Sequence, residues 1–246
     1  MKLLNKFLEL FNSLINLITM LFFSVLILFG LYAFYDSFHI VNGAKLPQEI
    51  LTLRPNKKEE KSFSLAELQN INKDICGWIT IDNTSIDYPL VIGKNNLEYL
   101  SLDYTRKYST AGSIFMDYRN SNDFTDNYNI IYGHNMKQGY MFSDIKKFID
   151  LSFFNNHLTG TLYAVQGIYN IDIIYVARVN AFSNEIYNPI LYKETKIDEL
   201  INYFELNAIH KNNTWIEPDA KLMLLSTCDV AGSSDRLVLL TKITLK

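Results

Sequence analysis

The chain has 246 residues, a formal net charge of −3 and a pI near 5.8. This length suits one domain of about 200 residues with its own hydrophobic core, carried behind a short anchoring segment. Lysine and arginine are scattered rather than grouped into a basic stripe, so nucleic acid is excluded as an expected partner. The 16 tyrosines and 16 phenylalanines suit half-buried strands, and the composition therefore favours a mainly β fold.

An uncharged apolar segment, LINLITMLFFSVLILFGLYAFY, occupies residues 14–35. As a helix it is long enough to cross about 30 Å of hydrocarbon. Lys2 and Lys6 precede it, so the positive-inside rule places the N-terminus in the cytoplasm and the rest of the chain outside the cell membrane. A cleavable signal peptide is the alternative, but residues 28–37 offer no clean small-x-small cleavage site. We therefore expect a single-pass protein in which residues 1–36 form a cytoplasmic tip and an uncleaved transmembrane anchor.

The next region, residues 37–62, combines glycine and two prolines with the charged run 57–61 and shows little apolar periodicity. We expect a stalk that contains some helix. Ser64 then stands in an N-cap position with Glu67 in the matching capping-box position, which predicts a short helix. That helix opens the last and largest region, residues 63–246, which we expect to be one extracellular domain.

Beyond this helix, short runs rich in β-branched and aromatic residues alternate with turn-forming residues. Eight runs of this kind favour a closed or nearly closed β-barrel. Their ranges are 78–81, 88–92, 113–116, 128–132, 161–166, 171–180, 221–227 and 237–245. Two helical patterns, at residues 141–149 and 195–208, interrupt the strands and are expected to cover the barrel.

The sequence contains two cysteines, Cys76 and Cys228, and their spacing fits neither a redox motif nor a zinc site. Cys76 is interpreted as a small buried residue at the start of a strand, although a disulfide between the two is an alternative in an exported protein. An unpaired thiol outside the membrane is exposed to oxidation unless its chemistry is used. Cys228 is therefore the candidate nucleophile.

A catalytic thiol needs a neighbouring base or cation to favour the thiolate, and a proton donor for the leaving group. Histidine can supply both, and the chain has four. His134 follows an apolar strand through Gly133, at a place where a strand opens into a loop, whereas His39, His157 and His210 are interpreted as solvated loop or helix-end residues. His134 is the candidate base, with a purely structural histidine as the alternative.

Arg236 follows Cys228 across a short turn, and a hairpin between the two flanking runs would return it to the side of the cysteine. A guanidinium placed there would stabilise an oxyanion or hold a peptide carbonyl. The alternative is an ion pair with Asp229 or Asp235 that fixes the turn.

Three acidic residues, Asp117, Asp123 and Asp126, lie close together in the sequence, but their loop lacks the glycine and the final glutamate of a calcium-binding hand. We expect a solvated turn and no metal site.

Taken together, three motifs resemble the Cys-His-Arg signature of the sortases, and their order along the chain, His then Cys then Arg, matches as well. They are Leu225-Ser226-Thr227-Cys228, Tyr132-Gly133-His134-Asn135-Met136 and Arg236-Leu237-Val238. The stretches 77–79, 86–91 and 112–119 resemble class B sortases in particular, and the similarity runs from about Leu65 to the C-terminus. One departure is Leu224, which stands where the family usually has threonine, and we expect an altered packing contact there.

This resemblance implies an eight-stranded sortase-type barrel with an N-terminal helical extension. It also implies a membrane-anchored cysteine transpeptidase that cleaves the C-terminal sorting signal of secreted proteins after threonine and joins them to an amine of a cell-wall (peptidoglycan) peptide. Cys228 would form the thioacyl intermediate, His134 would move the proton and Arg236 would hold the oxyanion. No cofactor is implied. Asn96, Ser226 and Tyr187 are the substrate-binding candidates.

Two other functions are weighed against this one. An exported cysteine peptidase would only hydrolyse its substrate, at a rate indifferent to added amine. In a non-catalytic surface binding module Cys228 would have no chemical role and would react with an alkylating reagent no faster than a free model thiol.

Overall fold

The structure is a computed structural model that describes residues 2–55, 64–136, 138–193, 197–227 and 234–246, together with the backbone of Cys228. The chain divides into two compact units, one ending at Asn42 and the other beginning at Gly43. The first unit is helical and the second contains the sheet.

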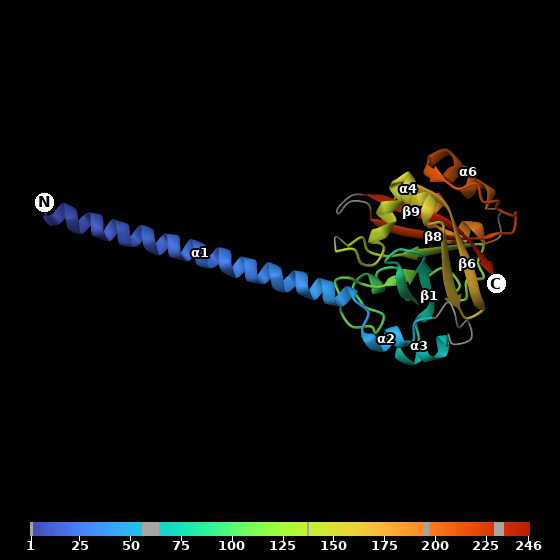
Figure 1. Cartoon of the computed structure of the whole chain (residues 1–246), viewed down its shortest axis with the longest axis horizontal. Coiled ribbons are helices and arrows are strands. Elements are labelled where there is room, and N and C mark those ends of the chain that lie inside the picture. Colours follow the sequence, from blue (N-terminus) through green and yellow to red (C-terminus); the bar gives the residue numbers. More distant parts are fainter. Residues whose placement is uncertain (1, 56–63, 137, 194–196, 229–233) are drawn as a thin grey trace. The chain divides into compact units, whose positions relative to one another are not determined.

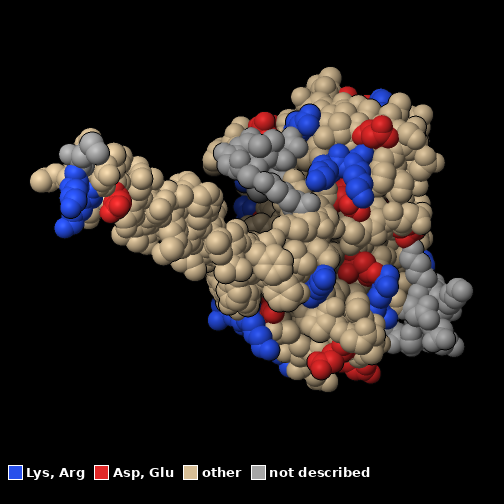
Figure 2. Space-filling view, turned by 60° about the vertical axis from the view of Figure 1, so that its left-hand side comes forward, with Lys and Arg blue, Asp and Glu red and all other residues tan. Residues whose placement is uncertain are grey.

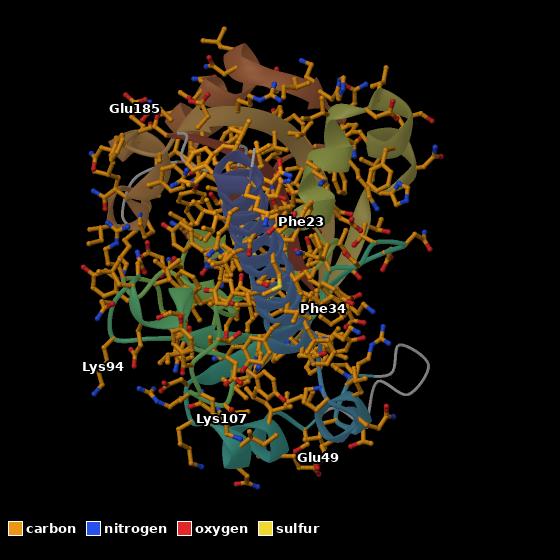
Figure 3. All side chains as sticks on the ribbon, turned by 90° about the vertical axis from the view of Figure 1, so that its left-hand side faces the viewer. Phe23, Phe34, Glu49, Lys94, Lys107 and Glu185 are labelled. Atoms are coloured by element: carbon orange, nitrogen blue, oxygen red, sulfur yellow. The ribbon has the colours of Figure 1, made fainter. Side chains whose placement is uncertain are left out.

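Helix α1 (Lys2–Ala44) contains the apolar segment expected to be an anchor. Its large apolar side chains are exposed, and Phe23 and Phe34 project outward from the ribbon (Figure 3). Space-filling atoms show charge at the N-terminal tip and an uncharged shaft (Figure 2). In the described part of the chain, this is the helix long and apolar enough to cross a membrane.

The second unit is built around a mixed barrel, with strand order β5-β1-β2-β3-β4-β8-β9-β6 and closure between β6 and β5 (Figure 1). Strands β2 and β3 pair in parallel, as do β4 and β8, and the other barrel neighbours are antiparallel. The barrel strands are β1 (Ile75–Ile81), β2 (Asp87–Ile92), β3 (Ile114–Met116), β4 (Tyr128–Tyr132), β5 (Thr159–Ala164), β6 (Gly167–Asn180), β8 (Lys221–Cys228) and β9 (Asp235–Leu245). The predicted eight-stranded barrel is confirmed, with each predicted run at a barrel strand.

A further strand, β7 (Ala208–Lys211), pairs with residues 175–177 in the second half of β6 and was not predicted. Its four residues follow directly on the end of a helix, and the sequence analysis assigned them to that helix and to an exposed loop. Short strands with one partner carry little alternating pattern of their own, which is why the sequence does not reveal β7.

Helices cover two sides of the barrel (Figure 1). Their bounds are α2 (Gln48–Thr52), α3 (Leu65–Ile71), α4 (Leu151–Asn156), α5 (Asn184–Tyr187) and α6 (Asp198–Asn207), with 3₁₀ turns η2 (Glu98–Leu100), η3 (Ser143–Ile149) and η4 (Pro189–Tyr192). The Ser64 side chain accepts the backbone N–H of Glu67 at the start of α3, as the capping motif predicts. The helix expected at 141–149 is instead η3 followed by α4, because Asp150 adopts an extended conformation and caps a new helix at the Phe153 N–H.

Residues 43–55 of the expected stalk belong to the second unit, and some of them take part in its core. Ala44 and Ile50 are buried, and Ile50 packs with Leu68 of α3 and Trp78 of β1. A second cluster packs α5, η4 and α6 against β4, β6, β8 and β9, and it includes Leu224, whose side chain is fully buried among apolar neighbours. Leucine at this position therefore contributes to core packing.

Cys76 lies in β1 as a free, buried cysteine, and burial raises the pKa of its thiol to about 12. The interpretation of Cys76 as a buried structural residue is confirmed. A thiol with so high a pKa is protonated at neutral pH and therefore inert as a nucleophile.

Positive and negative side chains are intermixed on the face of the molecule shown in Figure 2. This face offers no field of one sign, in keeping with the small net charge of −3.

Candidate active site

The three strands that carry the predicted catalytic residues are neighbours in the barrel, in the order β4-β8-β9. Strand β4 pairs in parallel with β8 so that Tyr132 lies opposite Ser226, and the Gly133 N–H continues this ladder by donating to the Ser226 carbonyl at 3.1 Å. His134 comes two residues after Tyr132 and Cys228 two residues after Ser226, so both positions lie at the same end of adjacent strands.

Strand β9 completes this arrangement from the other side of β8. It pairs with β8 in the predicted antiparallel hairpin, and its register sets Arg236 directly opposite Cys228. Facing residues of an antiparallel pair have Cα atoms about 4.5–5.5 Å apart. The fold therefore brings the backbone positions of Cys228, His134 and Arg236 together; the side chain of Cys228 lies outside the described residues.

His134 is half-buried, and its ring is oriented by the backbone of η2. Its Nε2 is 3.0 Å from the Leu100 carbonyl oxygen. A carbonyl oxygen only accepts, so Nε2 carries the hydrogen in this contact and Nδ1 is the other ring nitrogen open to proton transfer. The main chain is fixed as well, because the Phe142 N–H donates to the His134 carbonyl at 3.0 Å.

Gly133 holds His134 at this place because the site has no room for a side chain. A Cβ on Gly133 would come within 2.5 Å of Ile114 Cδ1 and 2.7 Å of the Phe142 ring. We expect Gly133→Ala to lower the free energy of unfolding by about 1–3 kcal/mol through overpacking. Because the same displacement moves His134, turnover should fall as well. Thermal unfolding and peptide-cleavage kinetics measure the two effects, and a variant with unchanged melting temperature and rate would contradict this account.

Arg236 lies at the start of β9 and is partly exposed. Its Nη1 donates to the Asp235 carbonyl oxygen at 3.1 Å, which steers the guanidinium along the strand end. The proposed ion-pair partner Asp229 lies outside the described residues.

These residues share an open groove of about 670 Å³. Its walls come from the loop before η2, the ends of β3, β4, β8 and β9, and the segment around α5. Figure 3 shows Lys94, just before this loop, and Glu185 of α5 toward the same side of the domain. The lining includes all described candidates: His134, Arg236, Asn96, Ser226 and Tyr187.

The three substrate-binding candidates are held by specific hydrogen bonds. The Tyr187 hydroxyl and Ser226 Oγ lie 2.9 Å apart, which joins α5 to β8. Asn96 accepts the Tyr118 N–H through Oδ1 at 3.0 Å and donates from Nδ2 to Asp117 Oδ2 at 2.8 Å. Each side chain is therefore positioned by its neighbours before any substrate arrives.

Asp117 is fully buried, so the expectation that it lies in a solvated turn is wrong. Its carboxylate accepts from Arg119, Asn96 and the Tyr132 hydroxyl. Burial by itself would raise the pKa of Asp117, but the hydrogen bonds from Arg119 and Asn96 outweigh it and hold the pKa below its ordinary value. Asp117 is therefore ionised in the fold. Asp123 accepts the backbone N–H of Thr125, and Asp126 accepts the backbone N–H of Ser121.

Several further side chains line the groove that the sequence did not single out. Among them Arg119 and Tyr132 are polar, and burial, followed by the Asp117 carboxylate, raises the pKa of Tyr132. Leu97 and Phe182 are apolar and strongly exposed, at 73% and 85%. The Asp-x-Arg spacing at 117–119 is a signal for a local ion pair, whereas the apolar pair carries no signal in the sequence.

Two other histidines are packed rather than solvated. The His157 ring stacks on Phe153 with centroids 3.7 Å apart, and His210 Nε2 donates to the Ile149 carbonyl at 2.7 Å. His157 caps the end of α4, as expected of a helix-end residue, but its ring is partly buried. His210 lies in β7 and is partly buried, so its interpretation as a solvated loop residue is wrong. Neither lines the groove.

Comparison with known proteins gives close similarities across most of the chain, although no protein-family model matches it. A sortase B of Listeria monocytogenes serovar 1/2a is 34% identical over 200 residues, which are 79% of this chain and 80% of that protein. A class B sortase of Streptococcus pyogenes involved in pilus biogenesis superposes with a TM-score of 0.68 at 31% identity, covering 75% of this chain and 100% of that one. A Staphylococcus aureus sortase B in complex with substrate gives a TM-score of 0.67 at 29% identity, covering 73% and 84%.

Proposed function

This chain belongs to the class B sortases, which makes it a transpeptidase of the cysteine type, and on that basis we propose the details of its reaction. We propose that it cleaves a C-terminal sorting signal after threonine and transfers the threonyl acyl group to an amine of a cell-wall peptide. The partners are secreted proteins that carry the signal, and a peptidoglycan precursor or cross-bridge that carries the amine.

In the first step the Cys228 thiolate adds to the threonine carbonyl carbon, and the carbonyl oxygen becomes an oxyanion near Arg236. Collapse of this intermediate breaks the C–N bond while His134 gives a proton to the departing nitrogen. A thioester to Cys228 remains. In the second step the amine adds to the thioester carbonyl, His134 takes up the amine proton, and the C–S bond breaks to release the new amide and the thiolate.

The strand register is the observation that supports this assignment most strongly. Strand β8 places Cys228 opposite Arg236 on one side and beside the β4 end that carries His134 on the other. A groove of about 670 Å³ opens at these strand ends, which is large enough to take a short extended peptide.

The experiment that tests the proposal separates transfer from hydrolysis. A library of threonine-containing pentapeptides is incubated with the protein, with and without oligoglycine as a probe amine, and the products are identified by mass spectrometry. We expect slow hydrolysis alone and a new threonyl amide when the amine is present. A hydrolysis rate indifferent to the amine, with no amide product, would indicate an exported peptidase instead.

We also propose that α1 anchors the enzyme with its N-terminus in the cytoplasm and its catalytic domain outside. The uncharged segment 14–35 and the lysines at positions 2 and 6 support this orientation. Removal of residues 2–36 is expected to shift the protein from the membrane to the soluble fraction while turnover of a soluble peptide is retained. Fractionation after alkaline extraction measures the shift, and a truncated protein that stays with the membrane would contradict the anchor.

A further inference from the structure

A buried ion pair lies beside the groove. Arg119 donates to both carboxylate oxygens of Asp117, from Nε at 2.8 Å and from Nη2 at 2.7 Å. The Asp117 side chain is fully buried, and Arg119 is about one-quarter exposed. A two-point contact of this kind fixes the guanidinium in direction as well as in position.

This ion pair reaches both walls of the groove. On one side Asp117 Oδ2 accepts Asn96 Nδ2 at 2.8 Å, and on the other Arg119 Nη2 donates to the Tyr187 carbonyl oxygen at 2.5 Å. Between them the Tyr132 hydroxyl donates to Asp117 at 2.9 Å. Asn96, Tyr132 and Tyr187 line the groove, whereas Asp117 does not.

We propose that the Asp117–Arg119 pair is a positioning device that sets the separation of the groove walls and thereby the affinity for the peptide substrate. This inference rests on the proposed function only in assuming that the groove binds a peptide. Asp117 acts on that peptide solely through Asn96, Tyr132 and Arg119.

The geometry accounts for the choice of arginine. The Arg119 guanidinium donates to the Asp117 carboxylate from Nε and Nη2, and the same Nη2 also donates to the Tyr187 carbonyl oxygen. One rigid, planar group therefore links α5 to the end of β3. Holding this carbonyl also keeps the Tyr187 hydroxyl beside Ser226 Oγ, and the Tyr132 and Tyr187 rings stacked 6.2 Å apart. Lysine would preserve the positive charge, but its ammonium group is not planar and lacks the paired N–H donors of a guanidinium.

The test compares Arg119→Lys with Glu205→Gln, a change in an ion pair with Lys211 whose residues do not line the groove. With the library peptide that wild type turns over fastest, Arg119→Lys should raise KM about tenfold and change kcat less than about threefold. Glu205→Gln should leave both constants unchanged. Because lysine keeps the positive charge beside Asp117, the fold should persist, and circular dichroism checks this. A KM equal to that of wild type would overturn the inference.

A crystal structure of the Arg119→Lys protein tests the same inference without any measurement of peptide turnover. We expect the Tyr187 carbonyl to move away from residue 119 and the Tyr187–Ser226 contact to lengthen. A wall that stays in place overturns the inference. If the wild-type enzyme turns over no library peptide, the proposed function fails, and this structural comparison still decides whether the pair positions the wall.

Discussion

Replacing Cys228 with alanine is expected to abolish both cleavage of the sorting peptide and transfer to the amine. Without the thiol no thioacyl intermediate forms, and the loss in kcat should be on the order of 10⁴-fold or more, as for other enzymes that lose their nucleophile. The register places residue 228 opposite Arg236 at the end of β8, beside the groove. Discontinuous peptide-cleavage assays with product separation measure the effect.

Cys76→Ala is the matched control, because this second thiol is buried in β1 and has a pKa raised to about 12. It should retain turnover. Alkylation by iodoacetamide separates the two thiols further: the wild-type protein should react at Cys228 and the Cys228→Ala protein should react far more slowly. If the Cys228→Ala protein still turned over the peptide, a mechanism with Cys228 as the nucleophile would be ruled out.

Replacing His134 with alanine is expected to have the second-largest effect, a fall in kcat of about 10²–10⁴-fold, the range that a positioned proton-transfer group supplies. The ring is already oriented by its contact with the Leu100 carbonyl, and Gly133 fixes its backbone. Since it donates a proton in the first step and accepts one in the second, both acylation and transfer should slow. Single-turnover measurements of each step test this.

His157→Ala is the control for this variant. The His157 ring stacks on Phe153 and does not line the groove, so its loss should affect stability more than turnover. If His134→Ala kept wild-type kcat while His157→Ala lowered it, the proton-transfer role would belong elsewhere.

Much of the barrel could be predicted because each of its strands carries its own pattern. β-branched and aromatic residues separated by turn residues mark these strands, and the hairpin of β8 and β9 follows from two such runs with a short turn. β7 could not be predicted, because its four residues are defined by pairing with β6 and not by an alternation of their own.

The candidate site, too, could be predicted only in part. A short turn after a strand suffices to bring Arg236 back to Cys228, so local reasoning anticipated that pairing. The parallel pairing of β4 with β8 joins segments almost one hundred residues apart, and no local pattern in the sequence predicts it. The expectation of a solvated Asp117 was wrong for the same reason. Its burial depends on contacts with Tyr132 and Asn96, which the sequence of its own loop does not reveal.

The central claim is that Cys228, beside His134 and Arg236, carries the acyl group from peptide to amine. Intact-mass spectrometry of the protein mixed with an active library peptide, in the absence of amine, tests it most directly. The account predicts an adduct equal in mass to the peptide fragment that ends in threonine, mapped to Cys228 and discharged on addition of oligoglycine. An enzyme that cleaves the peptide without this adduct, or carries it on another residue, would contradict the account.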